Sequence, residues 1–380
     1  MSKLTTPSKS LCKTLLGIHQ WLWQRVIHSA SLSDSSLRFC RILLPTLYLI
    51  FYMPDFTWIA SMPDAWYDPA PLSIGSLFSG FPPLIFFQLA QSALILSAFA
   101  IIIGFNARRC GLLFCFLHVL INSFEYGFGK IDHVAHVFTL CFFCLSCSNW
   151  GAANQSNKYN LPIRGEVLLA LLVTFGMFTA GFEKALRWID FDTNTSGFLS
   201  WYFGGYNNLD RNELLAPYLT QFPRLGLELF DYAAVAFELS PFLFLLLGKR
   251  AWTLWVTTAC CFHAGTTALL NISFCYQIFG YIPFLLPALP YLQVTSHSIR
   301  RKWMLALALV AACRLLPVWN ETVPLLPAIL FPSGLARLSL DFCIWLLLAA
   351  VGLYKLNYMS LAGKTAPAQS NTPESPNLPK

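Results

Sequence analysis

The stretch TFGMFTAGFEKALRW, from Thr174 to Trp188, ends a long apolar segment and carries a lysine in its last turns. Gly176, Ala180 and Lys184 follow one another at intervals of four, so a helix would place them on one face. Small residues let a neighbouring helix approach closely, which predicts that this face points into a helix bundle. An ammonium near the centre of a bilayer costs about 3 kcal/mol, so a buried Lys184 needs a partner or a task. The alternative is that its side chain snorkels to the membrane surface.

The composition of the chain is typical of a polytopic membrane protein. Of its 380 residues, 56% are hydrophobic and 11% are charged, and the mean hydropathy is +0.56. Soluble domains have about 25% charged residues. The net charge of +7 comes from short basic loops between apolar runs, so we expect a lipid bilayer and no nucleic acid as partner. Most of the 12 cysteines lie within apolar runs, which does not fit a disulfide framework.

Apolar segments near the 20 residues needed to cross a bilayer predict an all-α bundle of about ten transmembrane helices. They lie at residues 37–59, 83–104, 109–127, 131–148, 165–187, 223–247, 251–274, 276–294, 302–319 and 335–357. Together they make a transmembrane domain over 37–358. Basic side chains and an apolar helical face predict a cytoplasmic amphipathic segment at 1–36. Residues 359–380, rich in Pro, Ser, Asn and Thr, predict a disordered tail.

The charges of the connecting loops orient these segments. Basic groups such as Arg108/Arg109 and Lys249/Arg250 fall in every second connection, whereas the longer intervening connections are acidic. Basic loops stay on the cytoplasmic side, so we expect both termini there. The long connection 188–222 would lie outside, where its aromatic and glycine residues suit a piece folded over a site.

With this orientation, five segments contribute ionisable side chains, most of which fall in the outer half of the membrane, with Glu238 lower and His263 near the middle. They are His118, Glu125, Asp132, His133, His136, Lys184, Glu228, Asp231, Glu238 and His263. A shared depth predicts one polar pocket that opens outward, because unrelated structural residues would show no preference for one leaflet. Desolvation there favours the uncharged amine of Lys184, the form that acts as a general base. An acid such as Glu183 or Asp231 would stabilise the ammonium that results.

Each of these side chains also has a structural interpretation. Glu125 and Asp132 fit interfacial helix ends, and His118 and His263 fit hydrogen-bonded core histidines. Structural pairing with a histidine or hydroxyl would equally account for Asp231 and Glu238.

Two patterns in the sequence resemble metal-binding motifs. His133 and His136 are spaced as two ligands could be, but no further ligand stands at a defining spacing, so we expect no metal. The motif CxxCxxC at Cys141, Cys144 and Cys147 fits small buried side chains better than an iron–sulfur site, because no fourth ligand is evident.

Five blocks of the sequence resemble one known family. The run FTAGFEK at 178–184 resembles the FxAGxxK segment of the vitamin K-dependent gamma-carboxylases and their bacterial relatives, which share the horizontally transferred transmembrane (HTTM) domain. Similar blocks are WYDPAPLS at 66–73, DHVAH at 132–136, FELSPFLFLL at 237–246 and CFHAGTTALLNISF at 261–274.

The resemblance implies an enzyme that acts on reduced vitamin K or another membrane quinol. It makes Lys184 the base that deprotonates the quinol, which oxygen then converts to an epoxide while carbon dioxide adds to a glutamate. It assigns assisting roles to His133 or His136, beside Asp132, and it matches His263 to the family's FH histidine. Two departures argue against protein carboxylation. Glu183 stands where the carboxylases have a second lysine, and the last segments are not followed by a large soluble domain.

On this basis we expect an enzyme of the bacterial cytoplasmic (inner) membrane. The alternative is a non-catalytic membrane protein that assists the maturation or export of a secreted peptide, or a transporter. A transporter would extend its polar path through both leaflets.

Overall fold

The computed structural model describes residues 9–128, 136–151, 164–190, 192, 194–286, 297–331 and 333–365. These residues form a bundle of helices and contain no β-strand, only a single bridge between Asp68 and Phe128. The predicted all-α helical bundle is therefore confirmed for this part of the chain.

The α-helices vary in length from short turns to full spans. They are α1 (Lys9–Ala30), α2 (Asp34–Leu47), α3 (Leu84–Ile103), α4 (Ala107–Glu125), α5 (His136–Cys147), α6 (Gly165–Trp188), α7 (Gly197–Asn208), α8 (Arg224–Leu239), α9 (Pro241–Leu247), α10 (Lys249–Leu270), α11 (Ile278–Leu285), α12 (His297–Trp319), α13 (Leu326–Leu330) and α14 (Gly334–Thr365). A π-helical turn, η1 (Tyr48–Tyr52), continues α2.

Among the described residues, five helical segments are long and apolar enough to cross a membrane. They are Asp34–Ser61, Leu84–Ile103, Ala107–Glu125, Gly165–Trp188 and Gly334–Leu361. The bent pair α8 and α9 makes a sixth if it counts as one span. The other predicted segments coincide with α5, α10, α11 and α12, of which α5 and the apolar part of α12 (Trp303–Trp319) are short for a span. Part of the segment 276–294 lies outside the described residues.

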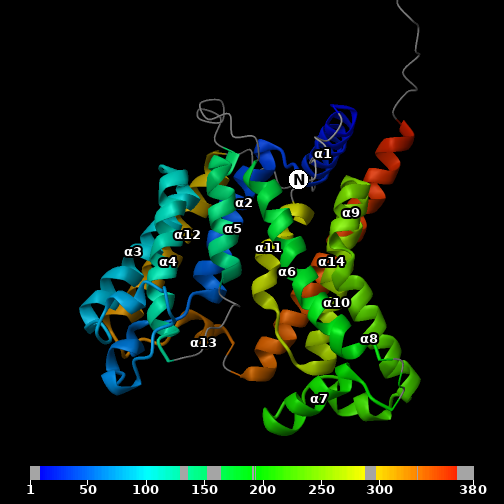
Figure 1. Ribbon diagram of the computed structural model, residues 1–380. Coiled ribbons are helices and arrows are strands. Elements are labelled where there is room, and N and C mark those ends of the chain that lie inside the picture. The colour runs from blue at the N-terminus through cyan, green and yellow to red at the C-terminus, as the bar shows by residue number, and fades with distance from the viewer. Residues whose placement is uncertain are drawn as a thin grey trace, which may run out of the picture.

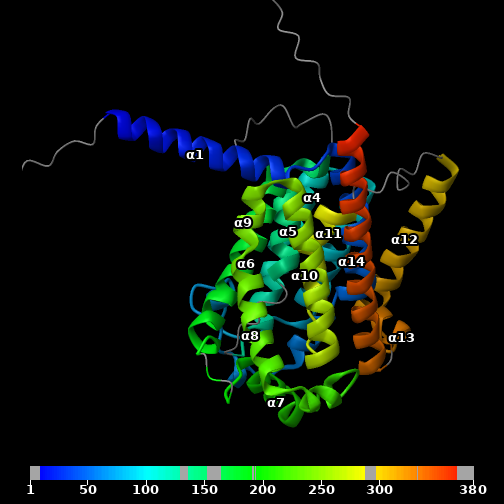
Figure 2. The same ribbon diagram turned by 90° about the vertical axis from the view of Figure 1, so that its right-hand side faces the viewer.

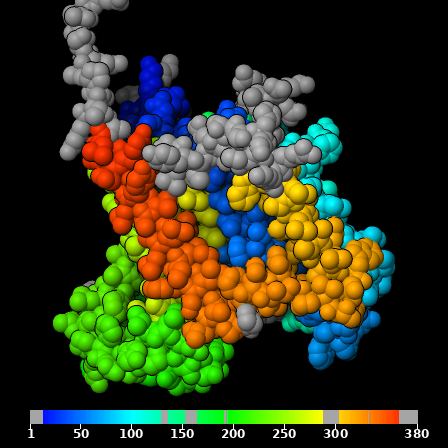
Figure 3. All heavy atoms as spheres, turned by 180° about the vertical axis from the view of Figure 1, so that it is seen from behind, coloured from blue at the N-terminus to red at the C-terminus, as the bar shows by residue number. Residues whose placement is uncertain are grey.

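The long helices run side by side, and two helices lie across the ends of the bundle. Figures 1 and 2 show α1 across one end and α7 across the opposite end. The last turns of α14 reach the same end as α1. Helix α14 continues to Thr365, past the boundary placed at Met359. From behind, atoms of α2 and α11 are visible between α12 and α14 (Figure 3).

The break between α8 and α9 is a 49° bend at a proline. Pro241 lacks an N–H group and its ring clashes with the carbonyl of the preceding turn, so the helix cannot continue straight. The carbonyl of Phe237 accepts hydrogen bonds from the Ser240 hydroxyl (2.7 Å) and from the indole of Trp255 (3.3 Å) instead. Because Glu238 is adjacent to this break, the bend fixes its position against α6.

Helices α10 and α14 pack together over most of their length. They are in close contact at Gly352, where an added Cβ would lie 2.2 Å from the Thr257 hydroxyl. The buried rings of Trp252, Trp255 and Trp345 fill the interior beside this crossing. The main core thus extends from the end of α1 to α14.

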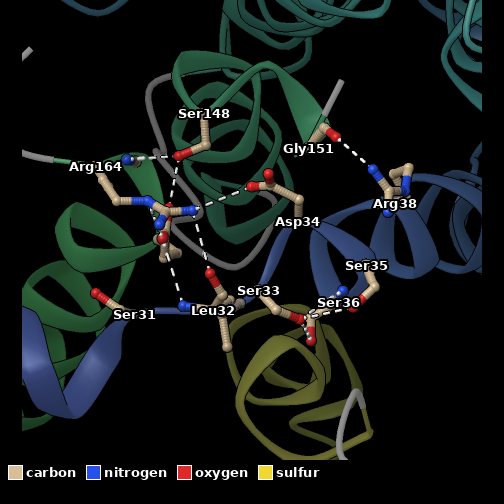
Figure 4. Close-up of polar contacts among 12 residues, drawn as sticks. Ser31, Leu32, Ser33, Asp34, Ser35, Ser36, Arg38, Ser148, Gly151 and Arg164 are labelled. Atoms are coloured by element: carbon tan, nitrogen blue, oxygen red, sulfur yellow. Dashed lines mark hydrogen bonds and ion pairs between the residues drawn. The ribbon is translucent and has the colours of Figure 1, made fainter. Parts of the chain in front are cut away.

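A polar junction near the α1 end sets where α6 begins (Figure 4). Glu166, fully buried in the first turn of α6, accepts from Arg164 Nε (2.7 Å) and the Ser148 hydroxyl (2.6 Å). Arg164 Nη2 also donates to the carbonyl of Leu32 (3.1 Å) and lies 3.6 Å from Asp34. These contacts join the α1–α2 connection to the end of α5 and the start of α6.

Candidate functional site

Lys184 forms an ion pair with Glu238 between α6 and α8. Its Nζ donates to Glu238 Oε1, and the two side chains are 15% and 4% exposed. The acid partner is thus neither Glu183, which lies on the exposed side of α6 and pairs with Arg187 (3.4 Å), nor Asp231. An ammonium and a carboxylate removed from water require this kind of direct pairing.

The small residue that allows the pair is Gly181 and not Gly176. A Cβ at Gly181 would lie 2.7 Å from the Glu238 Cβ, whereas one at Gly176 would meet nothing within 4 Å. Positions 174, 181 and 188 of α6 are buried, and Gly176 is exposed. The face of α6 that packs against α8 is therefore rotated about the helix axis from the predicted face. Residues seven apart stay nearly aligned along a helix, whereas steps of four move gradually around it.

Two tryptophans flank the amine of Lys184. Its Nζ lies 5.3 Å from the ring centroid of Trp188 and 5.6 Å from that of Trp201, a residue of α7. These are cation–π distances. The two indoles meet edge to face at 5.9 Å, and an added Cβ at Gly197 would fall 2.1 Å from Trp188. Helix α7, from the predicted 188–222 connection, therefore packs against the pair.

Asp231 holds the first turn of α7. Its two carboxylate oxygens accept from the backbone N–H groups of Gly197 (2.9 Å) and Phe198 (2.7 Å). A carboxylate at a helix N-terminus satisfies otherwise unpaired N–H groups. In the connection that leads to α7, the Thr195 hydroxyl donates to Asp190 (2.6 Å), which lowers the pKa of Asp190. Asp231 thus binds α7, which occupies both of its oxygens.

His263, a residue of α10, lies near the ion pair between Lys184 and Glu238. Its Nε2 is 3.0 Å from the hydroxyl of Tyr281, which also contacts the sulfur of Met177 on α6 (3.7 Å). Phe262, the neighbour of His263, places its ring 4.9 Å from that of Phe237, the neighbour of Glu238. Two buried atoms have no hydrogen-bond partner among the described residues, Nδ1 of His263 and Oε2 of Glu238. The structure therefore brings Lys184, Glu238 and His263 into one neighbourhood.

His118 and its neighbours form a second group around α4 and α5. Nδ1 of His118 lies 2.8 Å from the Thr139 hydroxyl, and its ring stacks on Phe114 at 5.8 Å. His136 is within electrostatic range of His118 and places its ring 5.8 Å from that of Tyr126. Figure 1 shows α4 and α5 on the opposite side of α6 from α8.

The predicted residues are thus divided between two groups of helices rather than gathered in one. Glu125 ends α4, within electrostatic range of Tyr48. Asp132 and His133 lie outside the described residues. Glu228 is 3% exposed, and neither of its carboxylate oxygens has a hydrogen-bond partner in the described part of the chain.

Besides Glu166, three buried charged residues were not among the predicted site residues. Arg314 of α12 donates to the carbonyls of Leu49 and Met53 (2.7 Å for Met53), which closes the π-helical turn η1. Asp341 of α14 accepts from the Thr267 hydroxyl (3.0 Å), and Lys355 donates to a carbonyl of α11. A single charge within an apolar segment is the signal that could have identified them.

No group of three His, Cys, Asp or Glu side chains able to hold a metal occurs among the described residues. Of the three cysteines in the CxxCxxC motif, Cys141 and Cys144 are buried, and Cys141 donates to the Phe279 carbonyl (3.2 Å). The site within the described residues is therefore one of amine, carboxylate, imidazole and indole groups. Comparison of the chain with family models, with curated proteins and with solved structures found no match.

Proposed function

We propose that the chain is an HTTM-type membrane enzyme whose Lys184–Glu238 pair takes a proton from a reduced quinone. The observation that carries this proposal is the buried ion pair itself, with a second carboxylate oxygen, Oε2 of Glu238, that lacks a partner among the described residues. The resemblance of residues 178–184 to the carboxylase segment supplies the substrate class.

The pair has the groups that deprotonation of a weak acid requires. An ammonium–carboxylate pair and an amine–carboxylic acid pair contain the same atoms, and burial favours the uncharged arrangement. In that arrangement the proton of the pair is on Glu238, so the neutral amine of Lys184 accepts the proton of a phenolic hydroxyl and the quinol is left as its monoanion. The ammonium that forms donates to Oε1 of Glu238, the contact seen between the two side chains, and the quinol anion balances its charge. Trp188 and Trp201 offer flat apolar faces beside the amine, which suit an aromatic ring.

The neighbouring His263–Tyr281 pair would assist. Tyr281 donates or accepts at its hydroxyl according to the tautomer of His263, so the two side chains can pass a proton along the hydrogen bond between them. His133 or His136, beside Asp132, remain the resemblance's candidates for a further assisting role.

We also propose the finer topology for this enzyme. It has ten spans, with both termini on the cytoplasmic side of a bacterial inner membrane and α1 along the interface. Two observations support it: the ends of the described chain lie at one end of the bundle, and α1 leaves Leu15, Leu16 and Trp21 about half exposed. In this orientation α7 and the Lys184 pair face the outside.

The test is oxygen consumption by the full chain in bilayers supplied with a reduced menaquinone. Lys184→Ala abolishes turnover, and Lys184→Arg does so as well, because a guanidinium keeps the charge but does not act as a base. Glu183→Gln, on the exposed side of α6, keeps turnover. Unchanged turnover in Lys184→Ala would overturn the proposal. Extraction of the purified protein gives a second measurement, since near-stoichiometric quinone supports the enzyme and phospholipid alone favours the peptide-maturation or transport alternative.

A further inference from the structure

The corner between α9 and α10 gathers positive charge. Gly248 makes the turn with a φ of +116°, and Lys249 and Arg250 are the first two residues of α10. Lys355 of α14, 6% exposed, is within electrostatic range of Lys249. In the described part of the chain, none of these three cations forms an ion pair.

The contrast with another basic position at the α1 end shows that this charge is uncompensated. Arg164 is paired with Glu166 and lies near Asp34. At the α9–α10 corner, Lys249 and Lys355 instead donate to backbone carbonyls, of Ser31 (3.4 Å) and Phe284. The first turn of α10 adds N–H groups that have no side-chain cap, together with the positive end of a 22-residue helix.

An apolar groove leads away from this corner. It is an open groove of about 500 Å³, lined by Leu247, Arg250, Ala251, Leu254 and Leu356. Arg250 is its one charged lining residue, and Leu254 lies about 6 Å further along α10, where the rise is 1.5 Å per residue. Leu247 and Leu254 are 61% and 45% exposed. The groove is thus positive at one end, apolar along its length and open toward the side of the bundle.

We propose that this groove binds one anionic phospholipid. Its phosphate group interacts with Arg250 and Lys249, and one acyl chain lies along Leu247, Leu254 and Leu356. The occupant is a lipid because the groove combines uncompensated cations with an apolar wall on a helix bundle that spans a membrane. Basic pockets between helices near the membrane surface favour anionic headgroups in this way. The inference is independent of the quinone chemistry at Lys184.

Native mass spectrometry of the full chain in detergent tests the proposal. Phosphatidylglycerol is compared with phosphatidylcholine of the same acyl chains, and phosphatidylglycerol binds more tightly. The double variant Lys249→Gln/Arg250→Gln lowers that preference by about tenfold or more, since each cation near an anionic headgroup contributes about a factor of five. Leu254→Trp, which fills the groove without changing the charge, weakens the binding of phosphatidylglycerol.

The matched control is Arg109→Ala, because Arg109 is an exposed basic residue in the first turn of α4. It leaves the lipid preference unchanged. The proposal is overturned if the double variant keeps the preference, if Arg109→Ala lowers it as much, or if Leu254→Trp binds phosphatidylglycerol as the wild type does. Displacement of phosphatidylglycerol by inorganic phosphate at equal concentration would also overturn it. That result would show that the site binds the anion alone and that the acyl chain contributes nothing. Thermal midpoints in lipid-free detergent confirm that each variant is folded.

Discussion

Gly181 lies directly against Glu238: an added Cβ would be 2.7 Å from the Glu238 Cβ and 3.0 Å from its backbone carbon. Helices α6 and α8 therefore approach as closely as their backbones allow, and Lys184, one turn further along α6, meets the Glu238 carboxylate. The ion pair depends on the absence of a side chain at 181 as much as on the two charges. The carboxylate of this pair is almost fully buried and the amine is mostly so.

Gly181→Ala should therefore separate α6 from α8. The methyl group meets backbone and Cβ atoms, which cannot rotate away, so we expect a loss of about 1–3 kcal/mol in stability from overpacking. Thermal unfolding in detergent measures it. Gly176→Ala is the control on the same helix, because it points into open space and exchanges glycine for a better helix former. Equal midpoints for the two variants would contradict the close contact.

The Lys184–Glu238 pair should show strong coupling between its two charges. Lys184→Met alone leaves a buried carboxylate and Glu238→Leu alone leaves a buried ammonium, so each single change should cost about 3–5 kcal/mol. The double variant replaces the pair by apolar side chains and should be close to the wild type in stability. A double-mutant cycle on thermal unfolding measures the coupling. Additive losses would show that the two residues do not interact as the structure indicates.

Much of the fold could be predicted because hydrophobic patterning sets the helices. Within the described residues each predicted segment contains a helix or a helix pair, although α11 covers only part of 276–294, and the connection 188–222 does contain a helix, α7, against the site. The number of segments that cross was harder to predict, because α10 carries threonines and His263 and stays buried among other helices. A segment enclosed by protein does not need the hydropathy of one that faces lipid.

The partners within the site could be predicted only in part. Lys184, Glu238 and His263 were among the expected residues, but which acid pairs with the amine depends on the bend at Pro241 and on Gly181. Neither the angle of the bend nor the closeness of the approach between two helices follows from residue spacing along the chain. Asp231 was expected in a pocket, yet the backbone N–H groups of the preceding helix, α7, take both of its oxygens.

Asp231→Ala should loosen α7 without unfolding the bundle. The N–H groups of Gly197 and Phe198 lose their acceptors, and removal of a helix-capping side chain costs about 0.5–2 kcal/mol. We expect faster amide hydrogen exchange over Gly197–Asn208, measured by mass spectrometry. Glu228→Gln lies one turn earlier on α8, and its carboxylate makes no hydrogen bond in the described part of the chain, so exchange in α7 should not change. Similar acceleration in both variants would mean that Asp231 does not hold the helix.

The two acids near Arg164 should differ sharply in their contribution to stability. Glu166 is fully buried and accepts from Arg164 and Ser148, so Glu166→Ala removes the acceptor of both side chains and leaves a gap at the start of α6, which should cost about 2–3 kcal/mol. The Asp34 side chain is 53% exposed and 3.6 Å from the same guanidinium, where solvent screens the interaction. Asp34→Ala should therefore cost about 1 kcal/mol or less. This figure includes the favourable interaction of the Asp34 carboxylate with the N-terminus of α2.

Thermal unfolding of the two variants in the same detergent compares these costs directly, because both remove an acid that faces Arg164. Measurements at low and at high salt distinguish a surface charge interaction from a buried contact. Salt should reduce the small effect of Asp34→Ala and leave that of Glu166→Ala nearly unchanged, since a buried contact is screened little. If Asp34→Ala destabilised the protein as much as Glu166→Ala, the start of α6 would be held by surface charge rather than by the buried carboxylate.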